Sequence, residues 1–190
     1  MSQSGHIPSR EEAWQLLCEW TKTPGLRGHA LAVEAAMRFY ARHFGEPEEL
    51  WGAIGLLHDF DYERYQTEED HPLKGAEELR RRGYDEAFVR AVMSHADYLK
   101  LERRTLAEKT LYAVDELCGL VVATALVMQR RTMAEVTPES VRKKMKSKGF
   151  ARKVNREDIV NGAAALGVDL DEHIANVVKA LQEAAPALGL

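Results

Sequence analysis

The chain has 190 residues, of which 45% are hydrophobic and 29% charged, and its formal net charge at pH 7 is −4. This length favours a single domain, residues 1–190, with a substantial hydrophobic core. The acidic balance argues against general nucleic-acid binding, which needs a basic surface. No stretch approaches the roughly 18 apolar residues of a membrane span, so we expect no membrane partner.

Two features of the chain indicate a cytoplasmic location. Met1 to Arg10 contains no apolar run of the kind found in signal peptides. The two cysteines, Cys18 and Cys118, lack the spacing of a disulfide framework, which suggests a reducing compartment. The sequence leaves the oligomeric state open.

Helical patterns fill almost the whole chain, and no segment alternates with the period of two that is typical of strands. Ser9 is the expected N-cap of the first helix, Glu12 completes a capping box, and Thr23-Pro24-Gly25 ends that helix. Further helices are expected at about 26–44, 47–59, 71–82, 85–95 and 105–131, with a polar, acidic loop at 60–70.

Three more helices are expected to begin at about Thr137, at Asn155, and at Asp169 or Asp171. His173, at the start of the last helix, has no partner in the sequence pattern. The sequence therefore predicts an all-α domain, with a helical core at about 26–131 and a C-terminal helical extension at about 132–190.

Four polar residues, each on a different predicted helix, lie on faces that are expected to be buried: His29, His58, His95 and Asp115. A single histidine on an apolar face is more often a satisfied core residue than a ligand. A buried carboxylate is costly unless it is paired or bound to a metal. No lysine or arginine lies one turn from Asp115 on its own face, so histidines from other helices are its expected partners.

The remaining members of this pattern are Asp59, which directly follows His58, and His71, which follows the acidic loop. Imidazoles combined with carboxylates suit divalent Fe, Mn, Co, Ni or Zn, and carboxylate-rich sites also admit Mg. The sequence contains none of the zinc-protease, EF-hand, Walker A or dinucleotide-binding motifs. These residues therefore predict a divalent-metal site of unspecified metal identity.

The order His29, His58-Asp59, His71, His95, Asp115 resembles the HD-domain superfamily of metal-dependent phosphohydrolases, an all-α fold. The run from His71 to Ala76, HPLKGA, resembles the HPxxGA segment of the HDIG-type branch, and Ser94-His95 resembles the next histidine of that branch. The whole chain resembles small bacterial proteins described as HD-superfamily hydrolases.

The chain also departs from this branch. Phe60-Asp61-Tyr62-Glu63 follows the His-Asp pair where the branch has Ile-Gly-Lys, and Ala96 follows His95 where cyclic-dinucleotide hydrolases have a second histidine. The resemblance therefore does not extend to hydrolysis of cyclic dinucleotides.

The resemblance implies a first metal held by His29, His58, Asp59 and Asp115. Asp59 would bridge to a second ion held by His71 and His95. It implies hydrolysis of a small phosphorylated metabolite or nucleotide by a hydroxide that the metal activates.

Five further residues are candidates for chemistry or substrate binding. Asp61 and Glu63, in the acidic loop, are candidate acid/base groups, although acidic loop residues are more often solvated. Arg27 is a candidate ligand for a substrate anion. Lys146 and Lys148 belong to a basic segment, 142–156, which is either a solvated helix face or a lid that contacts phosphate.

Two other functions remain open on the sequence. Some proteins with this six-ligand order are HD-fold di-iron oxygenases, which iron content and O₂ consumption would distinguish. A non-catalytic metal-binding signalling module would keep the metal for structure alone, so that removing the metal would melt the fold.

Overall fold

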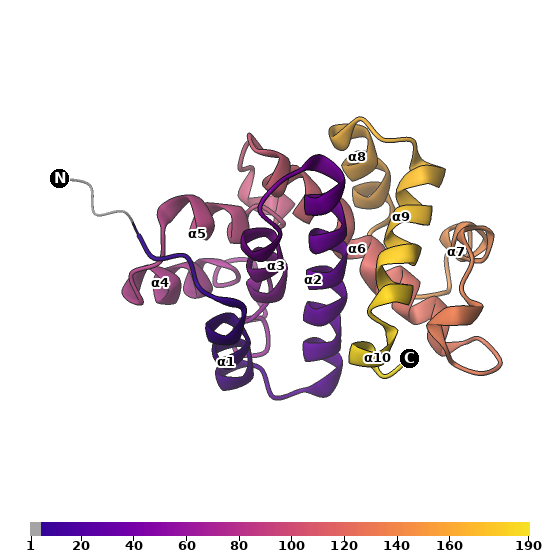
Figure 1. Cartoon of the computed structure of the whole chain (residues 1–190), viewed down its shortest axis with the longest axis horizontal. Coiled ribbons are helices and arrows are strands. Elements are labelled where there is room, and N and C mark those ends of the chain that lie inside the picture. The colour runs from indigo at the N-terminus through magenta and orange to yellow at the C-terminus, as the bar shows by residue number, and fades with distance from the viewer. Residues whose placement is uncertain (1–4) are drawn as a thin grey trace.

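The computed structural model describes residues 5–190, which form a bundle of ten α-helices with two single-turn 3-10 helices (Figure 1). Within this part no strand forms, and one isolated bridge joins His6 to Tyr84. Residues 1–4, which belong to the segment in which the sequence predicts no signal peptide, lie outside the described part. The helices are α1 (Arg10–Trp20), α2 (Pro24–Phe44), α3 (Glu48–Leu57), α4 (Leu73–Arg81), α5 (Glu86–Met93), η1 (Asp97–Leu99), α6 (Leu106–Leu126), η2 (Met133–Glu135), α7 (Pro138–Met145), α8 (Arg156–Leu166), α9 (Leu170–Glu183) and α10 (Ala185–Leu188).

The all-α prediction is confirmed, and the helix starts are explained by capping side chains. Ser9 and Glu12 form the predicted capping box of α1. Thr105 caps α6, and Asn155 and Asp169 cap α8 and α9 by accepting hydrogen bonds from backbone N–H groups of the first turn.

Several predicted helix ends are wrong by a few residues. Pro47 is the N-cap of α3 and not its first residue, and α3 ends at Leu57, before the His-Asp pair. Helix α5 ends at Met93 and α6 at Leu126, where the predictions were about 95 and about 131. The short α10 was not predicted.

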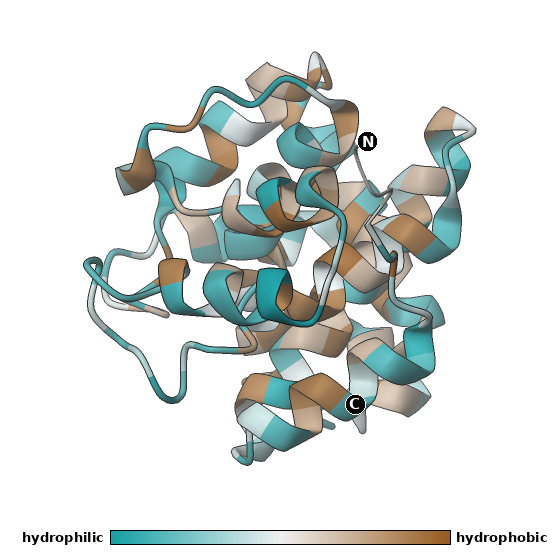
Figure 2. Cartoon of the chain, turned by 90° about the vertical axis from the view of Figure 1, so that its left-hand side faces the viewer, coloured by the Kyte–Doolittle hydropathy of each residue, from teal (hydrophilic) through white to brown (hydrophobic). Residues whose placement is uncertain are grey.

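The core forms where α2, α3 and α6 pack together. Figure 1 shows α2 and α3 side by side at the centre, with α4 and α5 on one side of them and α7, α8 and α9 on the other. Most helices carry a hydrophilic and a hydrophobic face, visible as teal and brown on the same ribbon in Figure 2. Val33 and Met37 of α2, Ile54 of α3 and Leu117 of α6 are among the buried side chains of this core.

The C-terminal helices pack directly against the N-terminal ones. Gly162 of α8 lies so close to α6 that an added Cβ would be 2.5 Å from the Cα of Ala113. His173 of α9 is fully buried between Tyr40 of α2, at 2.6 Å from the hydroxyl, and the Ala113 carbonyl, at 2.9 Å. His173 therefore has the partners that the sequence pattern did not reveal.

No helix within residues 5–190 combines the length and the apolar character that crossing a membrane requires.

Candidate metal centre

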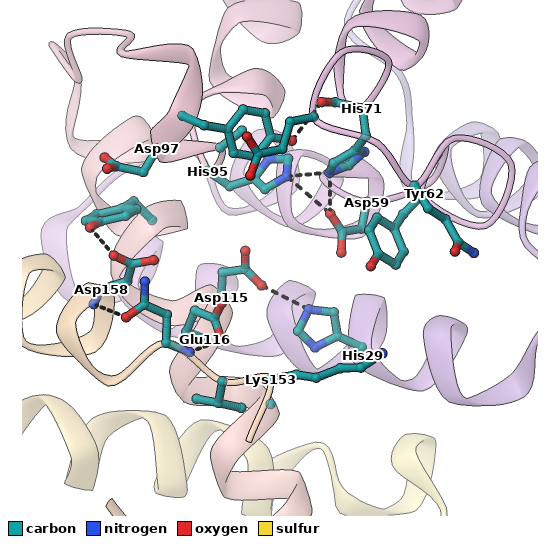
Figure 3. A pocket seen from close by; sticks show the side chains of 18 of the residues that line it. His29, Asp59, Tyr62, His71, His95, Asp97, Asp115, Glu116, Lys153 and Asp158 are labelled. Carbon is teal, nitrogen blue, oxygen red and sulfur yellow. Dashed lines mark hydrogen bonds and ion pairs between the residues drawn. The ribbon is translucent and has the colours of Figure 1, made fainter. Parts of the chain in front are cut away.

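The six predicted ligands come together in one place, from the ends of α3 and α5, the start of α4, the second turn of α2 and the middle of α6. Figure 3 shows all of them except the buried His58. They form two groups of three whose ligand atoms lie within 4.8 Å of one another: His29, His58 and Asp115 form the first triad, and Asp59, His71 and His95 form the second.

In the first triad, His29 Nε2 lies 2.9 Å from Asp115 Oδ1. The Nε2 atom of His58 lies 3.2 Å from His29 Nε2 and 3.4 Å from Asp115 Oδ1. His58 is fully buried, whereas His29 and Asp115 are partly exposed. The triad therefore sits at the inner wall of an opening rather than inside a closed core.

In the second triad, Asp59 Oδ1 lies 3.2 Å from His71 Nε2 and 3.1 Å from His95 Nε2. The two imidazole Nε2 atoms are 3.1 Å apart. The other carboxylate oxygen of Asp59, Oδ2, faces the first triad at 3.5 Å from His58 Nε2. Asp59 thus presents one oxygen to each triad, which is the arrangement that a bridging carboxylate requires.

These distances test whether a divalent ion fits the site. Two ligand atoms that are each about 2.1 Å from one ion lie about 3.0–3.4 Å apart in octahedral or tetrahedral geometry. The separations within both triads match this spacing. The donor set, four imidazoles and two carboxylates, also suits a divalent metal. The residues present therefore fit the group that the sequence pattern implies.

The second nitrogen of three histidines is already used, which leaves Nε2 free to bind an ion. Nδ1 of His58 donates to the Gly55 carbonyl and Nδ1 of His95 to the Val92 carbonyl, each at 2.7 Å. Nδ1 of His71 donates to Asp61 at 2.8 Å. In the neutral ring these bonds turn the Nε2 lone pair toward the triad, and lone pairs facing each other need a cation between them.

The electrostatics of the site also call for positive charge. Burial disfavours the charged form of His58, but the carboxylates of Asp59 and Asp115 outweigh it and raise the His58 pKa to about 9. Burial likewise opposes protonation of His71, and Asp59 and Asp61 outweigh it and raise the His71 pKa to about 9.

The carboxylates respond in the opposite sense. Burial opposes ionisation of Asp115, but His58 and His29 outweigh it and hold the Asp115 pKa well below its usual range. The same balance, set by His58, His71 and His95, holds the Asp59 pKa well below its usual range. Both carboxylates are therefore anionic, as metal ligands must be.

The structure places Asp61, one of the candidate acid/base groups, against His71 and the start of α4. Its side chain is fully buried, Oδ1 accepts from His71 Nδ1 at 2.8 Å, and Oδ2 accepts from the Gly75 N–H at 2.8 Å. An added Cβ on Gly75 would lie 2.8 Å from Asp61 Cγ, so glycine is needed for this close approach. Asp61 is therefore a positioning residue for His71.

The structure also places Glu63 and Arg27 away from the site. Glu63 accepts hydrogen bonds from the backbone N–H of Thr23 at 3.2 Å and from its hydroxyl at 2.9 Å, at the start of α2. Arg27 donates to the carbonyls of Thr21 and Cys18 at the end of α1. Neither side chain lines the cavity over the triads, and groups at the junction of α1 and α2 occupy both.

A cavity of about 750 Å³ opens over both triads. The predicted substrate ligands Lys146 and Lys148 do not line it, whereas Lys153 of the same basic segment does. The further lining residues that the sequence did not single out include Tyr62, Glu68, Asp97, Tyr98, Lys100, Tyr112, Glu116, Asn155 and Asp158.

Two signals in the sequence pointed to part of this wall. Asp97 and Tyr98 follow His95 within three residues, and the Tyr98 hydroxyl donates to the His71 carbonyl at 2.7 Å. Glu116 is next to Asp115, and burial together with the Asp115 charge raises the Glu116 pKa to about 7. The residues of the C-terminal segments gave no such signal, because only the packing of α8 against α6 brings them to the cavity.

The chain can be compared with known proteins at this point. A family model described as the HD domain matches residues 26–120, which is half of the chain. A threonine–tRNA ligase from Maridesulfovibrio salexigens is 54% identical over 48 residues. That match covers 25% of this chain and only 8% of the ligase, so the chain spans a small part of this relative. No solved structure matches the chain. From the family match and the arrangement of the His-Asp pair with its partners, we conclude that this chain belongs to the HD domain family.

Proposed function

We propose that the protein is a metal-dependent phosphohydrolase that acts on a small phosphorylated metabolite or nucleotide. The observation that supports this most strongly is the pair of ligand triads with Asp59 between them at the base of one cavity. The cavity volume of about 750 Å³ is in the range of small-molecule sites. Membership of a family that consists mostly of metal-dependent hydrolases adds to the case.

The charge of the cavity wall explains why a phosphate substrate would need metal. Glu68, Asp97, Glu116 and Asp158 line the cavity in addition to the two ligand carboxylates. This wall repels a phosphate ester unless cations offset it. When bound, divalent ions supply that positive charge and lower the pKa of a water molecule at the site.

Lys153 is the side chain that we propose for binding the substrate anion. It lines the cavity, and in Figure 3 it lies on the same side of the opening as His29. The other lysine of the wall, Lys100, faces Asp97 at 3.5 Å, whereas Lys153 forms no ion pair within the described residues.

The segment that carries Lys153 is held firmly. The Arg156 guanidinium donates to the carbonyls of Phe150, Ala151 and Val154, and the Asn155 N–H donates to Glu116 at 3.0 Å. Lys153 is therefore placed at the rim of the cavity by a fixed turn, without requiring the lid movement that the sequence suggested.

The test is metal analysis of the purified protein followed by a phosphatase and nucleotide-hydrolase screen with Mn²⁺, Mg²⁺, Co²⁺ and Ni²⁺. We expect phosphate release that depends on added metal and is lost in Asp115→Asn. Iron content with O₂ consumption and no phosphate release would instead support a di-iron oxygenase. Thermal unfolding on metal removal with no turnover of any substrate would support a non-catalytic binding module.

We also propose a cytoplasmic location. Cys18 and Cys118 are both free thiols, and Cys118 is buried. Unpaired cysteines are typical of a reducing compartment.

A further inference from the structure

A second, smaller cavity of about 250 Å³ adjoins the metal centre on its α2–α6 side. Its walls are apolar, and we call it the annex. It is lined by Pro24, Gly25, Gly28, His29, Gly119, Val122, Leu126, Leu188 and Leu190. His29 and Gly119 line the larger cavity as well, so the annex and the metal centre share a wall.

The two helices that supply His29 and Asp115 of the first triad also line the annex, with the same spacing on each. Gly25 precedes the ligand His29 by four residues on α2, and Gly119 follows the ligand Asp115 by four residues on α6. Residues four apart lie on one helix face, separated by one turn of about 5.4 Å. The annex therefore begins one helical turn from the metal ligands.

Glycine at these positions has no explanation in packing. A Cβ on Gly25 or Gly28 would meet no atom within 4 Å, and one on Gly119 would meet only the Val154 side chain, at an ordinary 3.7 Å. None of the three adopts a positive φ. Glycine within a helix is unfavourable compared with alanine, so what these residues provide is space.

Other helical glycines in the chain are different, because packing requires them. An added Cβ on Gly162 would lie 2.5 Å from the Ala113 backbone, and one on Gly55 would lie 3.0 Å from the Val33 carbonyl. The open glycines within helices are thus gathered at the annex, beside His29, whereas the helical glycines elsewhere are closely packed.

We propose that the annex binds an apolar group of the substrate, so that the substrate class is a phosphate ester carrying a compact hydrocarbon or aromatic group. This proposal rests on the proposed function. An apolar cavity of roughly 150 Å³ accommodates a benzene molecule, so the annex is large enough for a ring or a short chain. With its phosphoryl group at the residues that would hold the metal, such a substrate would place its apolar group at Val122 and Leu126, because His29 lines both cavities.

The experiment compares two phosphonates that hydrolysis does not consume, using calorimetry on the Mn²⁺-loaded protein. We expect hexylphosphonate to bind at least tenfold more tightly than methylphosphonate, because only the hexyl chain reaches the annex. In Gly25→Leu the ratio should fall to about one, since leucine fills the space. Gly149→Leu is the matched control, because Gly149 is also open and lies outside both cavities, and it should keep the wild-type ratio.

Equal affinities in the wild type would overturn the annex proposal, as would a hexyl preference that survives both Gly25→Leu and Gly28→Leu. If Gly25→Leu fails to fold, Gly28→Leu alone decides the result. If neither phosphonate binds, the proposed function is contradicted, and the annex is judged separately with hexan-1-ol. Amide NMR shifts at Gly28 and Gly119 on adding hexan-1-ol would then support the annex, and unchanged shifts would overturn it.

Discussion

Two of the candidate metal ligands are held by carbonyls that a helix leaves unpaired at its end. His58 directly follows α3 and donates from Nδ1 to Gly55, three residues earlier, and His95 uses Val92 near the end of α5 in the same way. The last carbonyls of a helix have no partner within the helix. Each of these hydrogen bonds therefore gives a partner to an unpaired backbone carbonyl and fixes the orientation of an imidazole ring.

His71 lies two residues before α4, where no helix-end carbonyl is available, and Asp61 holds it instead. In Asp61→Asn the amide has one acceptor oxygen, whereas the carboxylate accepts from both His71 and Gly75. We expect metal affinity at the second triad to fall about ten- to hundredfold, measured by calorimetric Mn²⁺ titration. Glu69→Gln, an exposed acid-to-amide change in the same loop, is the control. Equal affinities in both variants would contradict the positioning role.

Lys153 provides a second prediction for a single residue. Lys153→Ala should weaken binding of inorganic phosphate to the Mn²⁺-loaded protein by about tenfold, because a charge-assisted hydrogen bond contributes about 1.5–3 kcal/mol. Lys148→Ala, in the same basic segment but outside the cavity, should change this affinity little. Equal losses in the two variants would show that only the general charge of the segment matters.

At the scale of helices, the sequence predicts where elements begin better than where they end. Side chains such as Ser9, Thr105 and Asn155 accept hydrogen bonds from a first turn, and this chemistry is local and readable. Apolar residues continue past Leu126, but the chain turns there, with Arg131 at a φ of 55°. Tertiary packing decides that turn, so the periodicity of the sequence extends the helix too far.

The sequence likewise predicts some residues of the candidate site and misses others. The six candidate ligands could be named from the sequence because each lies at a recognisable position on or beside a helix, and helical phasing gives the direction of four of them. Lys153 and Asp158 could not, because they reach the cavity only through the contact of α8 with α6. Asp61 was named as an acid/base candidate, but its burial and its contact with His71 could not be predicted, since they depend on the fold of the 60–70 loop.

The contact of α8 with α6 predicts the effect of a single methyl group. Gly162→Ala would place a Cβ 2.5 Å from the Ala113 backbone, so the helices must separate. We expect a loss of about 1–3 kcal/mol in the free energy of unfolding, as overpacked cores show, measured by denaturant titration. Gly28→Ala, a helical glycine with open space, should not destabilise the protein. A neutral Gly162→Ala would contradict this close contact.

For the molecule as a whole, His173 joins α9 to α2 and α6 from a fully buried position. Burial lowers the His173 pKa below its ordinary value of 6.5, so the folded protein keeps this ring neutral. The unfolded chain binds a proton there more readily, so the contribution of His173 to stability is present above about pH 6.5 and is lost as the pH falls further.

The corresponding measurement is the free energy of unfolding between pH 7.5 and 5.0 for the wild type and for His173→Gln. Subtracting the two curves cancels the titration of the metal-site histidines, which both proteins share. We expect the wild type to lose more stability than the variant as the pH falls below about 6.5. Parallel curves would show that His173 does not titrate differently in the folded and unfolded states.

The central claim is that two triads hold divalent ions, and metal stoichiometry tests it most directly. Elemental analysis after Mn²⁺ loading and dialysis should give about two ions per chain for the wild type and for His43→Ala, an exposed histidine on α2. His29→Ala and His71→Ala each remove a ligand from one triad, so each should lower the count by about one. If both variants fold and retain the wild-type count, these residues do not bind the metal.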